Sequence, residues 1–213
     1  MLNRPYVNQF SISPYGKTIP YDADTARRAN GRINHGYKDL KACPELIDTV
    51  PELMADCALM NLVKSLNINN PSFFTTGCFS HYTLCKPSCQ TDDVLGYYEG
   101  YVEFAFNCHL RVQDAKNYFS LFFHFDRFLE DTRFSNPVKF DWLLGHAHFT
   151  QPNVKGFAAA VFLKTVAGPN IADTRTIWSN ALDVLGSFLD SVQPQQGTAM
   201  YMSSLEINGN IAA

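Results

Sequence analysis

The sequence predicts an α+β fold, a single domain in which helices pack on one mixed or antiparallel sheet. Segments with helical spacing of apolar residues alternate irregularly with segments of strand-like alternation. Two neighbouring strand-like segments are separated by a short turn, which indicates a hairpin. The chain of 213 residues is 46% hydrophobic and contains 17 Phe and 10 Tyr, enough for one large core. The order strand, helix, strand, strand, helix, strand also allows a ferredoxin-like split βαβ core.

The first part of the chain predicts an arm followed by the domain. Residues 1–22 contain three prolines and no sustained period, so we expect an extended N-terminal arm, with 23–213 forming the single α+β domain. A helix is expected over about 50–66, where Thr49 and Glu52 fit a capping box around Pro51. The following "NINNPSFFTTG" is typical of turns, and "GCFSHYTLCKPSC" continues this turn-rich stretch.

Regular elements are clearer from residue 97 onward. A half-buried strand is expected over 97–107, with its Tyr and Glu residues alternating against apolar ones. Asp114 caps an expected helix over 115–131, which is apolar nearly all round, as is typical of a central helix or one lying under a partner. Strands are expected over 138–150 and in "GFAAAVFLKTVAG", with a turn at 151–153 between them. A long helix then begins near Asp173 or Thr174 and ends near Val192, and "TAMYMSSLEI" is a candidate last strand.

Composition limits the classes of partner. The net charge of −3 disfavours bulk electrostatic binding of nucleic acid, and Glu99 and Glu103 would repel a phosphate backbone from the Tyr-bearing strand face. The chain has no apolar run of about 18 residues and no signal-peptide pattern at its start, so we expect no membrane partner. Six scattered cysteines then favour reduced thiols and a cytoplasmic location.

The stretch "GCFSHYTLCKPSC" contains a candidate metal site. Cys78, His81, Cys85 and Cys89 have the ligand types and pair spacings that a structural zinc requires, although only three residues separate the two pairs. The cofactor expectation is therefore none, or one structural zinc. Two other interpretations stay open: Cys78 as a nucleophile with His81 as its base, and ordinary thiols without a ligand.

Two short motifs suggest a catalytic alternative. "HYT" at 81–83 and "HFT" at 148–150 are both His-hydrophobic-Thr, and on a strand the His and Thr of each motif share a face. This pair resembles the paired motif of the 2H phosphoesterase family. The resemblance implies that His81 and His148 act as general acid and base, and that Thr83 and Thr150 bind phosphoryl oxygens of a phosphodiester or cyclic nucleotide.

The interpretation we favour is a non-catalytic interaction or assembly protein that works through protein–protein contacts, with a protein partner or a second copy of itself. No P-loop, dinucleotide-binding, zincin or nucleophile-elbow motif occurs in the sequence. The nearly all-apolar helix over 115–131 and the arm over 1–22 are the positive indications, because apolar surface beyond the needs of one core often marks an interface. The 2H-like phosphoesterase is the alternative.

Overall fold

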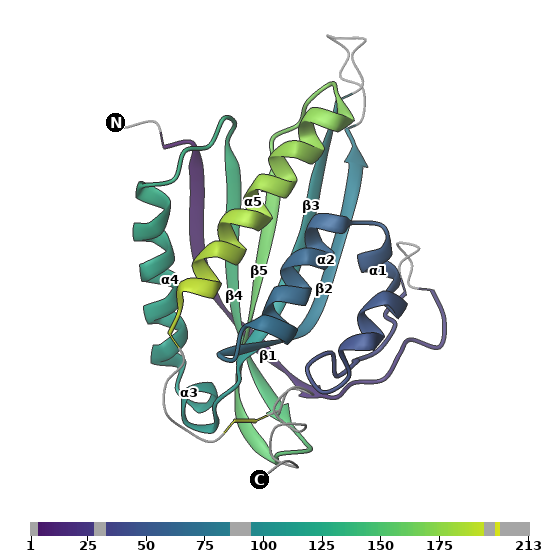
Figure 1. The fold of residues 1–213 in the computed structure, drawn as a ribbon, viewed down its shortest axis with the longest axis vertical. Coiled ribbons are helices and arrows are strands. Elements are labelled where there is room, and N and C mark those ends of the chain that lie inside the picture. The colour runs from purple at the N-terminus through teal and green to yellow at the C-terminus, as the bar shows by residue number, and fades with distance from the viewer. Residues whose placement is uncertain (1–3, 28–32, 86–94, 194–198, 201–213) are drawn as a thin grey trace.

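One five-stranded mixed sheet organises the chain, and its main helices lie together on one face (Figure 1). The computed structural model describes residues 4–27, 33–85, 95–193 and 199–200. The strands are β1 (Tyr6–Ile19), β2 (Phe73–Leu84), β3 (Gly96–Phe106), β4 (Val138–Phe149) and β5 (Val154–Thr165). The helical segments are η1 (Pro44–Thr49), α1 (Pro51–Met54), α2 (Cys57–Lys64), η2 (Ser65–Asn69), α3 (His109–Gln113), α4 (Ala115–Glu130) and α5 (Ile171–Ser191). The α+β class is thus confirmed.

The strand order is β1-β4-β5-β3-β2, with β1 parallel to β4 and the other neighbours antiparallel. Helix α4 connects β3 to β4, which run parallel with β5 inserted between them, so this part of the chain is a split βαβ unit. On the side of β3 away from β5, the edge strand of the sheet is β2, which comes directly before β3 in the chain. Most of the candidate strand "TAMYMSSLEI" lies outside the described residues.

The N-terminal segment differs from the expected arm. Residues 6–19 form an edge strand of the sheet, paired with β4 from Tyr6 opposite Val138 to Ile19 opposite Phe149. The pairing is irregular between Ile12 and Gly16, around Pro14. Proline is tolerated in an edge strand, where its missing N–H costs no ladder hydrogen bond, so the prolines did not prevent a strand here.

The Cys/His stretch also differs from the expected loop, because its first half belongs to β2. Strand β2 pairs with β3 from Phe73 opposite Phe106 to Leu84 opposite Gly96, with an irregularity at residues 75–77. Its small and polar residues gave it little strand-like alternation. The β3 strand and the β4–β5 hairpin agree with expectation.

The helices begin where local capping places them. The helix expected over 50–66 is divided into α1, α2 and η2, and Asp56 caps α2 by accepting hydrogen bonds from the backbone N–H groups of Ala58 and Leu59. Asp114 caps α4 as expected. The cap of α5 is Asn170, which accepts from the N–H of Ala172 and lies three residues before Asp173 and four before Thr174, the two expected caps.

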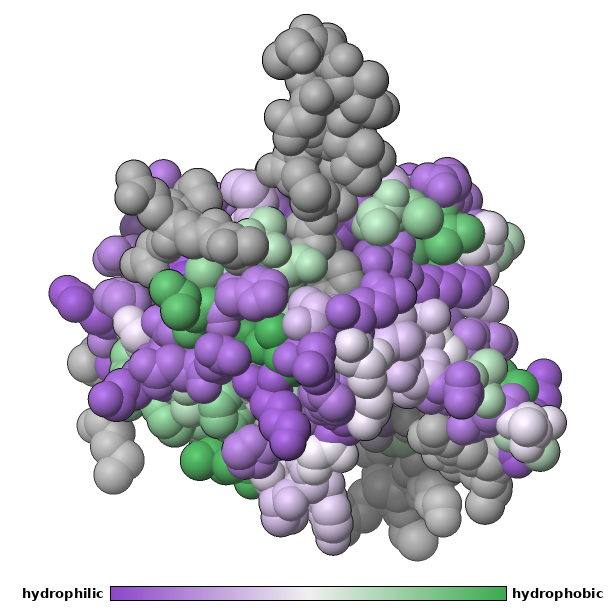
Figure 2. Space-filling view, turned by 90° about the horizontal axis from the view of Figure 1, so that it is seen from below, coloured by the Kyte–Doolittle hydropathy of each residue, from purple (hydrophilic) through white to green (hydrophobic). Residues whose placement is uncertain are grey.

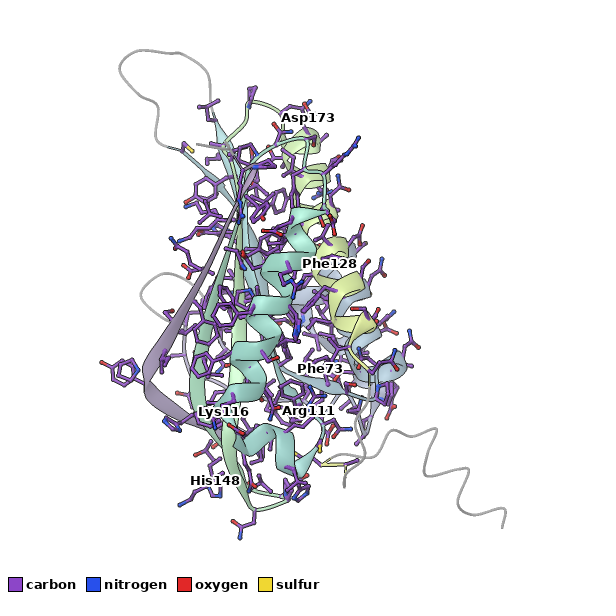
Figure 3. All side chains as sticks on the ribbon, turned by 90° about the vertical axis from the view of Figure 1, so that its left-hand side faces the viewer. Phe73, Arg111, Lys116, Phe128, His148 and Asp173 are labelled. Carbon is purple, nitrogen blue, oxygen red and sulfur yellow. The ribbon has the colours of Figure 1, made fainter. Side chains whose placement is uncertain are left out.

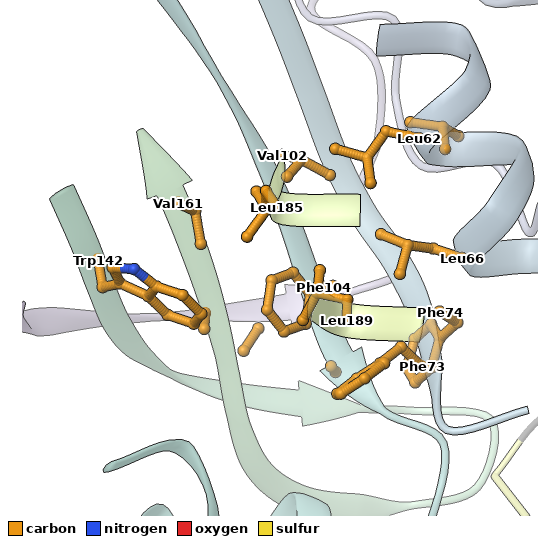
Figure 4. Packing of buried hydrophobic residues seen from close by; sticks show 14 of the residues in the cluster. Leu62, Leu66, Phe73, Phe74, Val102, Phe104, Trp142, Val161, Leu185 and Leu189 are labelled. Atoms are coloured by element: carbon orange, nitrogen blue, oxygen red, sulfur yellow. The ribbon is translucent and has the colours of Figure 1, made fainter. Parts of the chain in front are cut away.

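The main core lies between the sheet and the layer of α2, α4 and α5 (Figure 4). Trp142 of β4 is fully buried, with its ring centroid 6.0 Å from that of Phe104 and 5.5 Å from that of Phe125. Leu185 and Leu189 of α5 pack over the same strands. Full burial of one such side chain contributes about 1.5–3 kcal/mol relative to exposure, so this layer dominates the stability of the fold.

Candidate functional site

The sheet face opposite α2, α4 and α5, which we call the open face, carries side chains in ordered cross-strand rows. Directly paired residues on neighbouring strands point to the same face, so the register defines the rows. From β2 through β3 and β5 to β4, they are His81, Glu99, Lys164 and Lys139; then Phe79, Tyr101, Phe162 and Asp141; then Gly77, Glu103, Ala160 and Leu143. The first row is charged, the second is mostly aromatic, and the third contains small residues.

A cavity of about 920 Å³ lies over these rows. Its floor is the open face, and the chain between residues 33 and 40 lines its other side together with Tyr21 and Glu52. Gly77 and Ala160 of the third row line the cavity, and a Cβ at Gly77 would already contact Glu103, Tyr21 and Tyr101 at 3.4–3.6 Å. Its volume is in the range of small-molecule sites, which is about 300–1,000 Å³.

One end of the cavity is held by a polar network. Lys17 of β1 forms an ion pair with Glu103, whose Oε2 also accepts a hydrogen bond of 2.9 Å from the Thr76 hydroxyl. The Tyr21 hydroxyl donates to the Thr76 carbonyl at 2.9 Å, and the Lys17 ammonium lies 5.3 Å from the centroid of the Tyr21 ring. Burial raises the pKa of Tyr21, so its phenol stays neutral and remains a donor.

The other end contains a cluster of charges. Lys139 donates to Asp141 Oδ2 at 2.8 Å. The Lys164 ammonium lies 3.7 Å from Glu99 Oε2, too long for a hydrogen bond, and 3.9 Å from the centroid of the Tyr97 ring. Glu99 and Glu103, which argued against nucleic-acid binding at this face, are therefore each matched by a lysine. The sequence alone did not reveal these lysines because they come from other strands.

The expected zinc ligands are not brought together by β2. Residues three apart on a strand point to opposite faces, and accordingly Cys78 pairs with Val102 on the helix side while His81 pairs with Glu99 on the open face. Cys89 lies outside the described residues. Within the described parts of the chain, no group of three or more His, Cys, Asp or Glu residues could hold a metal ion.

The same divergence separates Cys78 from His81 as a nucleophile and base. Burial, with smaller contributions from Glu52 and Asp56, raises the pKa of the Cys78 thiol to about 12. The thiolate is the reactive form, so Cys78 is held in its unreactive state near neutral pH.

The two His-hydrophobic-Thr motifs do not meet in one cleft. Thr83 Oγ and His81 Nε2 are 2.8 Å apart on the open face, as their spacing predicts. His81 belongs to the same cross-strand row as Lys139, whereas His148 lies nine residues further along β4. At about 3.3 Å per residue, the two motifs are roughly 30 Å apart along the sheet. This exceeds the reach that a shared phosphodiester requires.

His148 has a local role at the far end of β4, where Figure 3 labels it. Its Nε2 lies 3.3 Å from Asn153 Oδ1 in the β4–β5 turn, and Thr150 donates to the carbonyl of Ile19. His146 stacks near Phe157, with ring centroids 4.8 Å apart, beside a smaller hollow of about 480 Å³. These contacts join the turn to the end of β1.

A second feature is an exposed apolar surface where β1 meets α4. The Phe10 ring of β1 lies 5.0 Å from that of Phe119 and 5.2 Å from that of Phe122, and Phe123 follows with 64% of its surface exposed. Ile12, on the same strand, is 60% exposed. We call Phe10, Ile12, Phe119, Phe122 and Phe123 the β1–α4 surface. Figure 3 shows the molecule from this side. The labelled Lys116 and Phe128 mark the two ends of the part of α4 that β1 runs beside.

The underside of the molecule has a different character. Seen from below, the molecule is largely hydrophilic, and its hydrophobic side chains form small separate groups (Figure 2). None of the described helices has the length and hydropathy that crossing a bilayer requires. Comparisons with protein-family models, with curated proteins and with solved structures found no match.

Proposed function

We propose that the protein is a non-catalytic assembly protein that pairs with a second copy of itself through the β1–α4 surface. The observation that carries the proposal is the exposed phenylalanine Phe123, together with Ile12, beside a strand edge with which no described strand pairs. An edge strand presents a row of unpaired N–H and C=O groups, and exposed apolar side chains next to it gain by being covered.

The chemistry of β1 favours a second copy over an unrelated partner. Residues 6–12, "YVNQFSI", contain no charged side chain, so two copies can lie antiparallel without placing like charges opposite each other. A two-fold axis normal to the sheet would extend it to ten strands and bring the two α4 helices to the same side. Their exposed Phe123 side chains would then lie in the contact rather than in water.

The irregularity around Pro14 limits how far such pairing extends. Residues 13–15 interrupt the register of β1 with β4, which resumes at Gly16, and Tyr15 in this interruption is 80% exposed. Proline and bulges are common devices against uncontrolled edge pairing, so the contact is expected to use residues 6–12 and to close as a dimer instead of growing into a filament.

Sedimentation velocity tests the proposal. Wild-type protein should change from monomer to dimer as its concentration rises to roughly 100 µM, by mass action. Phe123→Glu should shift the equilibrium to monomer, because two buried carboxylates would face an apolar contact. Met54→Glu is the matched control, since Met54 is 67% exposed on α1, near the opposite edge of the sheet.

Circular dichroism verifies that both variants keep the wild-type fold. A wild-type protein that stays monomeric throughout this range would refute the proposal. A dimer that Phe123→Glu leaves intact, or that Met54→Glu disrupts equally, would place the contact elsewhere and would also refute it.

A further inference from the structure

The cavity on the open face points to a second activity, independent of the β1–α4 surface. We propose that it binds a small planar aromatic molecule that carries an anionic group. Its lining provides an aromatic floor, two neighbouring ammonium groups and a fixed polar network, which together match the three parts of such a ligand. Ligand sites of this size combine apolar and aromatic walls with a few placed polar groups.

The floor offers three aromatic rings that a planar ligand can contact, tilted by 43° between Tyr101 and Phe162 and by 31° between Tyr101 and Phe79. Tyr101 and Phe162 lie side by side near the middle of the sheet with ring centroids 5.2 Å apart, and the Phe79 ring lies 6.5 Å from that of Tyr101 on the other side. Phe162 remains 41% exposed although it lies on a central strand. A planar ligand resting on this row would cover it, and the small side chain of Ala160 in the next row leaves depth beside it.

The cations are placed at one border of that floor. Lys139 and Lys164 are directly opposite each other on β4 and β5, a position in which like charges repel. Asp141 and Glu99 offset part of this repulsion, but the contact of 3.7 Å between Lys164 and Glu99 leaves the ammonium hydrogens of Lys164 available to another acceptor. A carboxylate, sulfonate or phosphate between the two lysines would supply that acceptor.

The opposite border of the floor fixes the orientation of a bound ligand. The ion pair of Lys17 with Glu103, and the hydrogen bonds through Thr76 and Tyr21, already satisfy one another. This end therefore offers a rigid polar wall rather than a further anion site. A long aliphatic ligand fits less well, because it would desolvate the charged row without replacing its contacts.

Fluorescence titration with 1-anilinonaphthalene-8-sulfonate tests the site directly. We expect one dye bound per chain, with displacement by AMP or by indole-3-acetate. The first competitor identifies a nucleotide-like phosphate and the second an aromatic carboxylate, the two sources of this chemistry. N-phenyl-1-naphthylamine serves as the uncharged analogue.

Charge variants give a readout that a purely structural role would not produce. Lys164→Gln should weaken sulfonate-dye binding about three- to tenfold, whereas Glu99→Gln, which removes the competing carboxylate, should strengthen it. Neither variant should change binding of the uncharged analogue by more than about twofold. Lys155→Gln, an exposed lysine further along β5, is the matched control and should leave both dyes unaffected.

Phe162→Ala should weaken both dyes, because it removes part of the floor while replacing a side chain that the fold leaves partly exposed. Circular dichroism confirms that each variant is folded. The proposal is overturned if the dye does not bind at one site per chain, if Lys164→Gln and Glu99→Gln change sulfonate binding in the same direction, or if neither competitor displaces it.

Discussion

Replacing the buried Lys41 with methionine should lower the free energy of unfolding by about 2–4 kcal/mol. Lys41 is only 2% exposed, and its ammonium donates to the carbonyls of Asn70 and Phe73 at 2.7 and 2.8 Å. The carbonyls of Leu66 and Asn67 lie at 3.4 Å from the same nitrogen. One cation thus joins the end of η2, the following turn and the start of β2 to the segment that lines the cavity.

The magnitude follows from two opposing effects. A hydrogen bond to a charged group contributes about 1.5–3 kcal/mol, and a buried carbonyl left without a partner costs about 1–3 kcal/mol. Against this, methionine avoids the several kcal/mol needed to desolvate the ammonium of Lys41. The loss of at least two strong acceptor contacts exceeds that gain, so the variant is destabilised although methionine fills a similar volume.

Urea unfolding followed by the fluorescence of Trp142 and Trp178 measures the change. Lys64→Met is the control, because Lys64 is 41% exposed, its ammonium lies 3.5 Å from Asp48, and such surface pairs contribute about 0–1 kcal/mol. If Lys41→Met unfolds within about 0.5 kcal/mol of the wild type, the ammonium does not organise these carbonyls and the reasoning fails.

Three further predictions concern other contacts. Gly100→Ala should lower the free energy of unfolding in urea by about 2–4 kcal/mol, because a Cβ would collide with the carbonyl oxygen of Phe79 on the facing strand and approach Trp178. Gly145→Ala is the control and should change stability by less than about 1 kcal/mol, because the nearest atom to a Cβ there is 3.6 Å away. Asp56→Ala should lower the free energy of unfolding by about 2–3 kcal/mol, since Asp56 both caps α2 and accepts a hydrogen bond of 2.7 Å from Trp178 Nε1. A loss below about 1 kcal/mol would mean that the hydrogen bond to Trp178 adds nothing to the cap. Iodoacetamide at pH 8 should modify Cys57 before Cys78, and the rate at Cys78 should still be rising at pH 11, because its pKa is raised to about 12. Because the folded state holds the proton of this thiol more tightly, the contribution of Cys78 to stability is complete below the ordinary thiol pKa and is lost as the pH rises from there toward 12. Equal alkylation rates of Cys57 and Cys78 at pH 8 would contradict the raised pKa.

Local signals in the sequence were sufficient for several elements. The alternation around Tyr101 identified β3, and Asp114 identified the start of α4, because both depend on residues close in the chain. The β4–β5 hairpin was recognisable from its turn for the same reason. The sequence predicts Asp173 or Thr174 as the cap of α5, whereas the structure has Asn170, because all three residue types are good caps and local sequence does not rank them.

Non-local pairing explains what the sequence did not reveal. Strand β1 depends on β4, whose first residue is more than 130 positions away, so its prolines were the stronger local signal. Cys78 and His81 have a spacing that suits a metal in a turn, but on a strand the same spacing separates them. The sequence correctly placed Glu99 and Glu103 on one face of β3. Their charges are offset by Lys164 and Lys17, which come from other strands and so could not be paired with them from the sequence.

The parallel pairing of β1 with β4 also sets an order in which the chain can be completed. During synthesis, β1 emerges first, yet its hydrogen-bonding partner from Val138 onward emerges only after β2, β3 and α4. Closing so long a loop costs conformational entropy before any ladder bond repays it, and contacts of this kind slow folding. We therefore expect β1 to be the last strand to join the sheet. A nascent chain ending before β4 would hold β1 without its native neighbour, with both strand edges unpaired, and unpaired edges of this kind make a folding intermediate prone to aggregation.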